Sequence, residues 1–310
     1  MRILGDTHLN FLSKRKIAMV LSIVLIVLSI GSFLTRGLNF GIEFTGGVVV
    51  EAGFPDAADL TMIRSALDEA EFSEAIVQHF GTSRDVTIQI MPREGVEGGQ
   101  IGNQVVEVLR TIEPDVVLRR LDFVGPQVGE ELAEQGGLAT LFSLIMILAY
   151  VAFRFQWKFA VGAVAALVHD VTIVLGFFSM TALSFDLSVL AAVLAVIGYS
   201  LNDTIVIFDR IRENMLRIRK QTTEQVMNLS LNQTLARTIT TSLTTLLVLL
   251  ALFFLGGEAV NGFSIALIVG ILIGTYSSIY VASPTALALD VTATDLLPPE
   301  KDDSELDALP

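Results

Sequence analysis

An aspartate and an arginine lie inside two of the most apolar stretches of this sequence. Asp203 falls in a run from about 187 to 208, and Arg237 in a run from about 233 to 255. An ionisable group inside a membrane segment costs several kcal/mol, so it indicates a functional role. A carboxyl can take up and release a proton, whereas the pKa of arginine stays above about 12. We therefore predict that Asp203 carries protons and that Arg237 tunes it.

The spacing of these two residues predicts that they lie at the same depth. Asp203 comes about five residues before the end of its run, and Arg237 about five residues after the start of the next. At about 1.5 Å of rise per residue, both side chains lie roughly 7 Å inside two antiparallel helices. Opposite charges at one depth can neutralise each other. The alternative to proton transport is a structural ion pair that only holds the two helices together.

Four further polar residues are secondary candidates for a proton path. Tyr199 lies one turn before Asp203 on the same face and is expected to hydrogen-bond to it. Asn202 fits a relay or an interhelical hydrogen bond equally well. His169 and Asp170 are adjacent and point about 100° apart on a helix, so we expect at most one, Asp170, to line the interior. A proton path and plain helix–helix hydrogen bonding both remain open for this pair.

These residues belong to six apolar runs, each close to the 20 residues or so that a bilayer core requires. The runs cover roughly 17–34, 137–153, 159–181, 187–208, 233–255 and 263–289. The first follows three basic residues, but it is too long for a signal peptide and lacks a small-residue cleavage site. We therefore expect a retained helix and an α-helical membrane protein with six transmembrane helices.

The composition excludes several classes of protein. Of 310 residues, 52% are hydrophobic and 17% are charged, whereas soluble domains have about 25% charged residues. This argues against a soluble enzyme and against a disordered chain. The net charge of −13 argues against nucleic-acid binding. The chain has no cysteine, three scattered histidines and no Rossmann, P-loop or HExxH motif, so we expect no metal, no cofactor and no enzymatic activity.

The basic residues predict the orientation of the chain. With the N-terminus in the cytoplasm, 13 of the 20 Lys and Arg residues fall on the cytoplasmic side, and the short loops near 182–186 and 256–262 have none. Both termini are therefore expected in the cytoplasm. The expected segments are a cytoplasmic N-terminus at 1–16, a first transmembrane helix at 17–36, helices two to six within 136–289 with a basic loop at 209–230, and a solvated acidic tail at 290–310.

The long loop at 37–135 is expected to fold as a domain on the far side of the membrane. It has 18 acidic residues and six arginines, hence a net charge of −12. Its pattern predicts strands at 47–53, 75–80, 85–91 and 115–124, and helices at 56–71 and 98–112. Pro55 and Asp56 are expected to begin the first of these helices. The order β-α-β-β-α-β is that of a ferredoxin-like α+β domain.

Two further patterns concern packing. The sequence GILIG at 270–274 has the small-residue spacing that lets membrane helices approach closely. The basic stretch at 209–220 is amphipathic, with Ile211, Met215 and Ile218 on one face, so we expect it to lie along the cytoplasmic interface. Docking of a partner protein is the alternative for this stretch.

Long motifs resemble the SecF branch of the SecD/SecF family, whose members belong to the bacterial protein-export machinery. The motifs are FGIEFTGG at 40–47, VGPQVGEEL at 124–132, LVHDVTIVLG at 167–176, GYSLNDTIVIFDRIREN at 198–214, SLNQTLARTITTS at 230–242 and GTYSSIYVAS at 274–283. They occur in order over nearly the whole chain. One departure is Glu43, where the commonest family form has Asp.

The resemblance implies a fold like that of resistance-nodulation-division transporters and a location in the bacterial inner membrane, with the large loop in the periplasm. It implies SecD as the partner, acting beside the SecYEG channel and the SecA motor on a preprotein, with YajC and YidC as candidate further partners. It also implies that the proton-motive force drives preprotein translocation and release. The essential membrane Asp and Arg of the family correspond to Asp203 and Arg237.

Two other functions are compatible with the residues alone. A proton-coupled small-molecule exporter of the same architecture would need a drug-sized, aromatic-lined pocket, for which the loop offers few aromatic residues. A non-catalytic assembly factor would tolerate charge-neutral substitutions at Asp203.

Overall fold

The structure, a computed structural model, describes residues 7–91, 98–218 and 220–296. Within this part of the chain, six helical spans are long and apolar enough to cross a membrane, which confirms the predicted fold class. They are η1 with α1 (Leu12–Lys14 and Arg15–Arg36), α5 (Pro126–Arg154), α6 (Trp157–Thr181), α7 (Leu187–Arg217), α8 (Thr223–Leu255), and α9 with η3 and α10 (Asn261–Ser277, Ser278–Ala282 and Ser283–Ala288).

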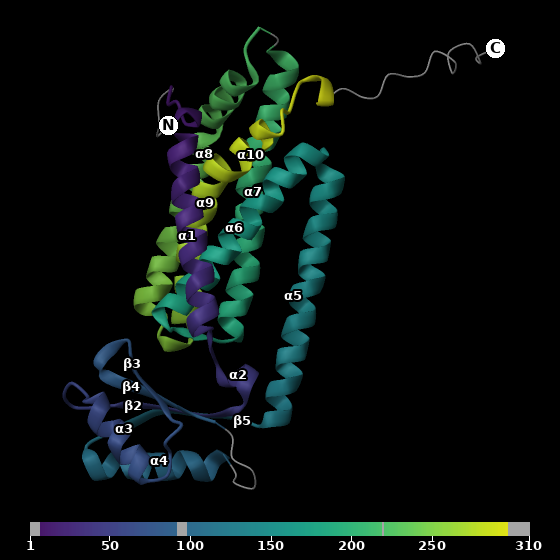
Figure 1. The fold of residues 1–310 in the computed structure, drawn as a ribbon. Coiled ribbons are helices and arrows are strands. Elements are labelled where there is room, and N and C mark those ends of the chain that lie inside the picture. Colours follow the sequence, from purple (N-terminus) through teal and green to yellow (C-terminus); the bar gives the residue numbers. More distant parts are fainter. Residues whose placement is uncertain (1–6, 92–97, 219, 297–310) are drawn as a thin grey trace.

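Helices α6, α7 and α9 form the inside of the helical bundle, with α1 and α8 packed on its flanks (Figure 1). The glycines of the GILIG sequence explain how α9 approaches α7. A Cβ atom at Gly270 would overlap the side chain of Val196, and one at Gly274 would lie 3.0 Å from Cβ of Ser200. The predicted close packing through these small residues is confirmed.

The last span changes its helical geometry within the membrane. Five residues, η3, form a π-helix between α9 and α10. Pro284 follows at the start of α10 and cannot donate a backbone hydrogen bond, which is a recognised cause of such local rearrangement. The segment also approaches α6 closely, because a Cβ at Gly162 would lie 2.7 Å from the carbonyl oxygen of Ala282.

The segment between α1 and α5 folds as a four-stranded antiparallel sheet with two helices. Its elements are β2 (Gly47–Gly53), α3 (Leu60–Glu69), β3 (Ile76–Phe80), β4 (Thr82–Ile90), α4 (Gly98–Ile112) and β5 (Val117–Val124). The strand order β3-β4-β2-β5 is that of the predicted ferredoxin-like arrangement. Val50 on the central strand β2 pairs with Ile88 on β4 and with Leu121 on β5. Helices α3 and α4 cover one face of this sheet (Figure 1).

The first helix of this domain begins later than predicted. Pro55 and Asp56 lie before α3, which starts at Leu60. Asp59 caps it instead, since its carboxylate accepts hydrogen bonds from the backbone amides of Thr61 and Met62 at 2.8 and 3.3 Å. An aspartate at this position satisfies amides that have no partner within the helix. Both acidic residues fit a helix start, so local pattern alone did not choose between them.

A short strap connects the sheet domain to the bundle. It consists of β1 (Asn39–Phe40), the single-turn α2 (Ile42–Thr45) and a glycine pair that leads into β2. Strand β1 pairs in parallel with β6 (Ser184–Phe185), which lies between α6 and α7. Gly47 has φ +121°, and a Cβ there would overlap the carbonyl oxygen of Ile90 on β4. Only glycine therefore fits this entry into the sheet.

Three membrane helices are longer than their apolar runs. Helix α5 begins at Pro126, inside the segment assigned to the sheet domain, and α7 continues to Arg217. The expected basic loop at 209–230 is therefore mostly helix, with α8 starting at Thr223. Ile211 and Met215 are buried in the bundle core, so the stretch from 209 to 218 does not lie flat along an interface. The apolar face that the pattern assigned to the membrane interface packs against other helices instead. Arg219, also part of the predicted stretch, lies outside the described residues.

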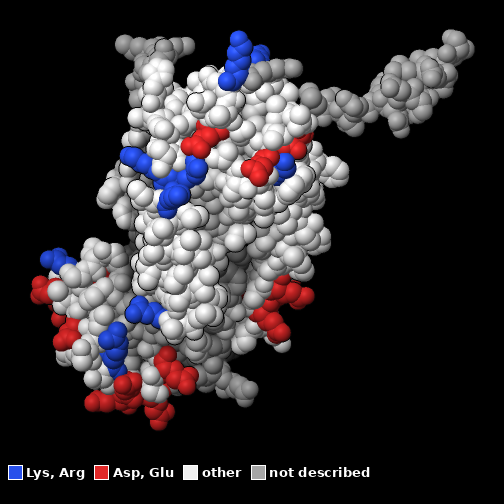
Figure 2. Space-filling view, turned by 45° about the horizontal axis from the view of Figure 1, so that its top comes forward, with Lys and Arg blue, Asp and Glu red and all other residues white. Residues whose placement is uncertain are grey.

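Charged side chains gather at the two ends of the molecule, with a broad uncharged band between them (Figure 2). The first and last described residues lie at the end opposite the sheet domain (Figure 1). Near this end, Asp295 in the 3₁₀ turn η4 (Thr294–Leu296) accepts a hydrogen bond from Lys158 at 2.7 Å, which lowers the pKa of its carboxyl. The expected solvated tail therefore does not begin at 290, and its part from 297 to 310 lies outside the described residues.

Candidate functional site

Asp203 is buried in the middle of α7. Its exposed fraction is 2%, and its Oδ2 atom makes no hydrogen bond with any residue that the structure describes. Buried polar atoms nearly always have a partner, so such an atom calls for an explanation. A carboxyl oxygen in this position can accept a proton without displacing an existing hydrogen bond.

Arg237 lies at the same depth as Asp203, as the sequence predicts. Asp203 comes 14 residues before the end of α7 at Arg217, and Arg237 comes 14 residues after the start of α8 at Thr223. Both are thus about 21 Å from the turn between these helices, deeper than the roughly 7 Å expected from the apolar runs.

The expected ion pair between these two residues is not formed. Within the described chain, no ion pair of 4 Å or less joins them, although Arg237 acts electrostatically on Asp203. Arg237 is exposed while Asp203 is buried. The two charged groups therefore lie near each other on adjacent helices without touching, which excludes a closed structural lock in this conformation.

Tyr199 does not form the hydrogen bond to Asp203 that the sequence predicts, and Asn202 does not face the interior of the bundle. The hydroxyl of Tyr199 is directed to Ser242 on α8 at 3.4 Å, and Ser242 contacts the hydroxyl of Thr275 on α9 at 2.8 Å. Tyr199 therefore links three helices and does not hydrogen-bond to Asp203. Asn202 is exposed on the outside of the bundle.

His169 and Asp170 form one buried polar cluster, contrary to the expectation that at most one would face it. Nδ1 of His169 lies 2.8 Å from Oδ1 of Asp170, and both side chains are at most 2% exposed. Oδ2 of Asp170 accepts hydrogen bonds from Ser200 on α7 at 2.5 Å and from Ser277 on α9 at 2.7 Å. Because α6 is surrounded by other helices, side chains on different faces of it all meet protein.

The cluster continues into α1 through residues that the sequence did not single out. Nε2 of His169 lies 3.1 Å from the hydroxyl of Ser22, which lies 3.0 Å from the hydroxyl of Tyr276. Tyr276 donates to the backbone carbonyl of Ala18 at 2.7 Å. A serine in an apolar run is a weak signal, since its hydroxyl can bond to its own helix.

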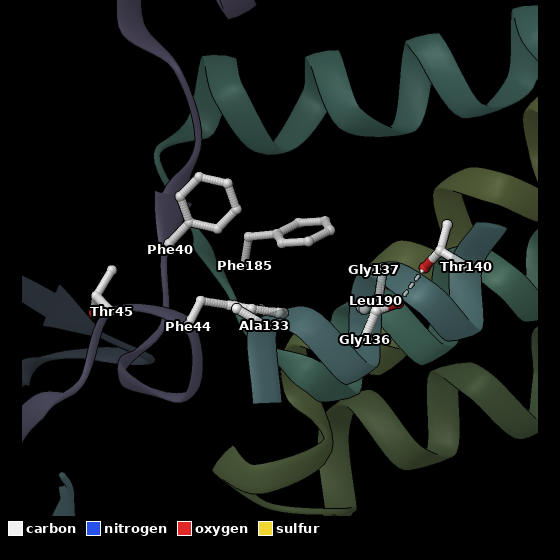
Figure 3. Close-up of a pocket in the computed structure, with 9 residues that line it drawn as sticks. All are labelled: Phe40, Phe44, Thr45, Ala133, Gly136, Gly137, Thr140, Phe185 and Leu190. Atoms are coloured by element: carbon white, nitrogen blue, oxygen red, sulfur yellow. Dashed lines mark hydrogen bonds between the residues drawn. The ribbon is translucent and has the colours of Figure 1, made fainter. Parts of the chain in front are cut away.

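A cavity of about 490 Å³ lies where the strap meets the bundle (Figure 3). Phe40, Phe44 and Phe185 line it on the side of the strap. The remaining lining residues are Thr45, Leu190 and four residues of α5, namely Ala133, Gly136, Gly137 and Thr140. The lining has no charged side chain, and Thr140 satisfies its hydroxyl within α5 by donating to the Gly136 carbonyl. The cavity suits an apolar group and holds no candidate for proton transfer.

A second acidic residue of interest, Glu43, belongs to the strap. Burial raises the pKa of its carboxyl above the usual 4.5, and the nearby charge of Asp186 raises it further, while its backbone hydrogen bond and Arg120 act in the opposite direction. Glu43 lies in α2, next to the glycine pair. The Glu43 carboxyl therefore takes up a proton at a higher pH than an exposed glutamate does. It lies in the strap that connects the sheet domain to the helical bundle.

The site offers two buried acidic groups for proton transfer. Within the described residues, no group of three or more His, Cys, Asp or Glu side chains could hold a metal ion. One buried acidic group, Asp203, belongs to α7, and the other, Asp170 of α6, contacts α7. Ser200 binds Asp170, and Asp203 follows one helical turn later on the same helix. Protonation at either group can therefore change how α7 packs.

Known proteins match this chain over nearly its whole length. Residues 104–292 match the family described as protein export membrane protein SecD/SecF, C-terminal, and residues 31–54 match the SecD/SecF GG motif. The chain is 50% identical over 309 residues to the protein translocase subunit SecF of Vibrio alginolyticus, covering 99% of this chain and 98% of the relative. It is 50% identical over 298 residues to that of Pseudomonas aeruginosa, covering 96% of each.

Two solved structures share the fold. The crystal structure of SecDF from Thermus thermophilus, described as a translocon-associated membrane protein, matches with a TM-score of 0.83 and 38% identity. The match covers 92% of this chain and 39% of that one, so this chain spans about two fifths of SecDF. A crystal structure of SecDF in a super-membrane-facing form matches with a TM-score of 0.68 at 38% identity, covering 93% of this chain and 39% of that one.

Proposed function

Because this chain belongs to the SecF family of protein translocase subunits, we propose that it couples proton movement through the membrane to preprotein translocation. In this proposal Asp203 binds and releases the proton, and the positive charge of Arg237 adjusts how tightly Asp203 holds it. The sheet domain moves in response. The observation that carries the proposal is the buried Oδ2 atom of Asp203, which has no hydrogen-bond partner among the described residues.

A cycle requires that Asp203 be able to exist with and without a proton. In the protonated form it needs no counter-charge, which fits the open arrangement with Arg237. In the ionised form, attraction to the guanidinium of Arg237 favours a closer approach of α7 and α8, because charges attract strongly where water is excluded. The distance between the two helices would therefore change with the protonation state of Asp203.

The exposed polar groups in the middle of the bundle support a partner subunit. Arg237 and Asn202 are exposed in the isolated chain at a depth where lipid would meet them. Polar side chains at that depth usually face protein or a water-filled cavity. We therefore propose that SecD covers this side of α7 and α8. The SecDF chain, of which the match covers 39%, supports a further part beside this one.

The remaining parts of the proposal concern orientation and other partners. The basic residues favour both termini in the cytoplasm and the sheet domain in the periplasm of a bacterial inner membrane. SecYEG, SecA and the emerging preprotein are then the proposed partners, with YajC and YidC as further candidates. The two solved structures match at equal identity but with different TM-scores, 0.83 and 0.68, as expected if the parts of this architecture rearrange.

The proposal is tested by Asp203→Asn and Arg237→Ala in cells that lack their own copy of the chain. Export of a preprotein is followed by pulse-chase with and without a protonophore. Both variants should lose the gradient-dependent part of export, down to the rate without the chain, and should still co-purify with SecD. Asp209→Asn is the matched control, because Asp209 lies on the same helix in an ion pair with Arg154 and should retain export. Full export by Asp203→Asn would refute the proton-carrier role and favour an assembly factor.

The cavity keeps a second candidate function open for testing. Its three phenylalanines and volume of about 490 Å³ are features that a proton-coupled small-molecule exporter would share. Phe44→Ala enlarges the cavity without touching the acidic groups. Under the proposed translocase function it should leave resistance to small apolar compounds unchanged; loss of resistance with normal preprotein export would favour the exporter.

A further inference from the structure

We propose that the His169–Asp170 pair is a second proton-binding site, which holds two protons in this conformation and thereby clamps α1 to the rest of the bundle. The pair lies within the bundle, and its contacts reach α1, α7 and α9. Nothing in the proposed role of Asp203 uses it. The argument rests on counting the hydrogens that the observed contacts require.

Four contacts connect Asp170 to the backbone of α1 in a single line. They run from Asp170 to His169, from His169 to Ser22, from Ser22 to Tyr276, and from Tyr276 to the carbonyl oxygen of Ala18. Each hydrogen bond needs one hydrogen. The hydroxyls of Ser22 and Tyr276 supply one each, and the carbonyl supplies none. The remaining two hydrogens must come from the His169–Asp170 pair.

The direction of the line is fixed by its end at Ala18. Tyr276 must donate to that carbonyl, so it can only accept from Ser22, which in turn can only accept from Nε2 of His169. Nε2 therefore carries a hydrogen. The second proton lies between Nδ1 and Asp170, and it belongs to the pair whichever atom holds it. With two protons the pair has no net charge, which lowers the cost of burying it in a membrane.

Loss of one proton from the pair would break this line. The proton that stays is most stable on Nδ1, where it faces the negative charge of Asp170, so Nε2 becomes bare. One of the contacts from His169 to the backbone of α1 would then bring together two acceptors without a hydrogen between them. The pair would also gain a net negative charge. Ser200 and Ser277 would still hold Asp170 from α7 and α9. The contact that fails would be one to α1, so deprotonation would release α1 and leave the other helices joined.

A movement of α1 would be passed directly to the sheet domain through the chain. Helix α1 leads through β1 and α2 into β2, the central strand of the sheet. This step rests on the proposed function, because it supplies a way for a proton in the membrane to move the domain that acts on the preprotein. The proton count itself does not depend on that function.

Few other titratable or charged groups belong to the elements packed around the pair. On α7 the nearest are Tyr199, directly before Ser200, and Asp203, one turn beyond it; on α9 and η3 they are Tyr276 and Tyr280. The basic residues Arg15, Lys16 and Arg36 lie near the two ends of α1, and Lys158 lies at the start of α6. Asp203 is therefore the acidic residue whose ionisation would most directly oppose that of the pair.

The test is ¹⁵N NMR of histidine-labelled chain assembled with unlabelled SecD in lipid bilayers. His8→Gln and His79→Gln leave His169 as the single histidine of the chain. We expect Nε2 of His169 to carry a hydrogen at neutral pH. A bare Nε2 would overturn the proposal and would leave the role of Asp203 untouched. Full export by Asp203→Asn would conversely leave this proton count standing.

Two tyrosine variants sharpen the measurement. Tyr276→Phe removes both the acceptor for Ser22 and the donor to the Ala18 carbonyl, so the contacts no longer fix a hydrogen on Nε2, and the fraction of chains that carry it should fall. Tyr280→Phe is the matched control, since the ring of Tyr280 packs 5.3 Å from that of Tyr276 but its hydroxyl takes no part in the line of contacts. It should leave Nε2 protonated. Loss of the Nε2 hydrogen to the same extent in Tyr280→Phe would overturn the proposal.

Discussion

Gly129 at the start of α5 packs directly against Gly46 of the strap. A Cβ atom at Gly129 would lie 2.8 Å from the backbone nitrogen of Gly46, closer than real Cβ contacts. The sheet domain thus meets α5 backbone to backbone. Motion of the domain must be transmitted to α5 at this contact, because neither side has a flexible side chain there.

Gly129→Ala should loosen the contact between the strap and α5. Overpacking of this kind costs about 1–3 kcal/mol, and the melting temperature of the purified chain should fall accordingly. Gly137→Ala on the same helix is the control. A Cβ there meets nothing within 4 Å, and alanine favours the helix by up to about 1 kcal/mol. Equal melting temperatures for the two variants would contradict the close contact.

Glu43→Gln should stabilise the chain at neutral pH but not at acidic pH. Burial raises the pKa of Glu43 in the folded chain, so the folded state binds its proton more tightly than the unfolded state. This favours folding below the unfolded pKa of about 4.5 and is lost as the pH rises through the higher folded value. The glutamine stays neutral and avoids that loss.

The measurement for Glu43 is the melting temperature in detergent between about pH 4 and about pH 8. The advantage of Glu43→Gln should grow with pH. Glu130→Gln, at an exposed position of α5, should show no such growth. A constant difference across the range would show that burial of the Glu43 carboxyl has no influence on stability.

Gly270→Ala should separate α9 from α7. The added methyl group would overlap Val196, which costs about 1–3 kcal/mol unless the helices move apart. The separation would also lengthen the hydrogen bond from Ser277 to Asp170, so preprotein export should fall. Gly198→Ala on α7 places its methyl group in open space and should retain export. Normal export and stability in Gly270→Ala would contradict the packing described here.

Ser32→Cys with Ser179→Cys should lock α1 to α6. The two hydroxyl oxygens lie 2.8 Å apart, and the chain has no cysteine of its own, so a single disulfide should form on oxidation. If α1 must move, oxidation should block export and a reductant should restore it. Leu34→Cys with Ser179→Cys is the control, because Leu34 is 78% exposed and should not cross-link. Undiminished export by the fully oxidised pair would exclude a moving α1.

Much of the architecture could be predicted from the sequence because it depends on local patterns. Each membrane helix is an apolar run, and each strand of the sheet domain alternates or forms a short apolar run between turns. The bounds of β2 (Gly47–Gly53) and α4 (Gly98–Ile112) agree with the prediction residue for residue. The ends of α5 and α7 did not, because a helix continues past its apolar run wherever tertiary contacts support it.

The sequence by itself determined which residues are costly to bury, and hence that Asp203, Arg237 and Asp170 need an explanation. It also placed Asp203 and Arg237 at one depth, since depth follows from the number of residues to the turn. Only the tertiary structure decided that Arg237 faces outward while Asp203 is buried, and that His169 reaches Ser22 on α1. The reason is rotation about the helix axis. A helix that is apolar on every side has no pattern to fix its rotation, so its neighbours decide which side chains meet.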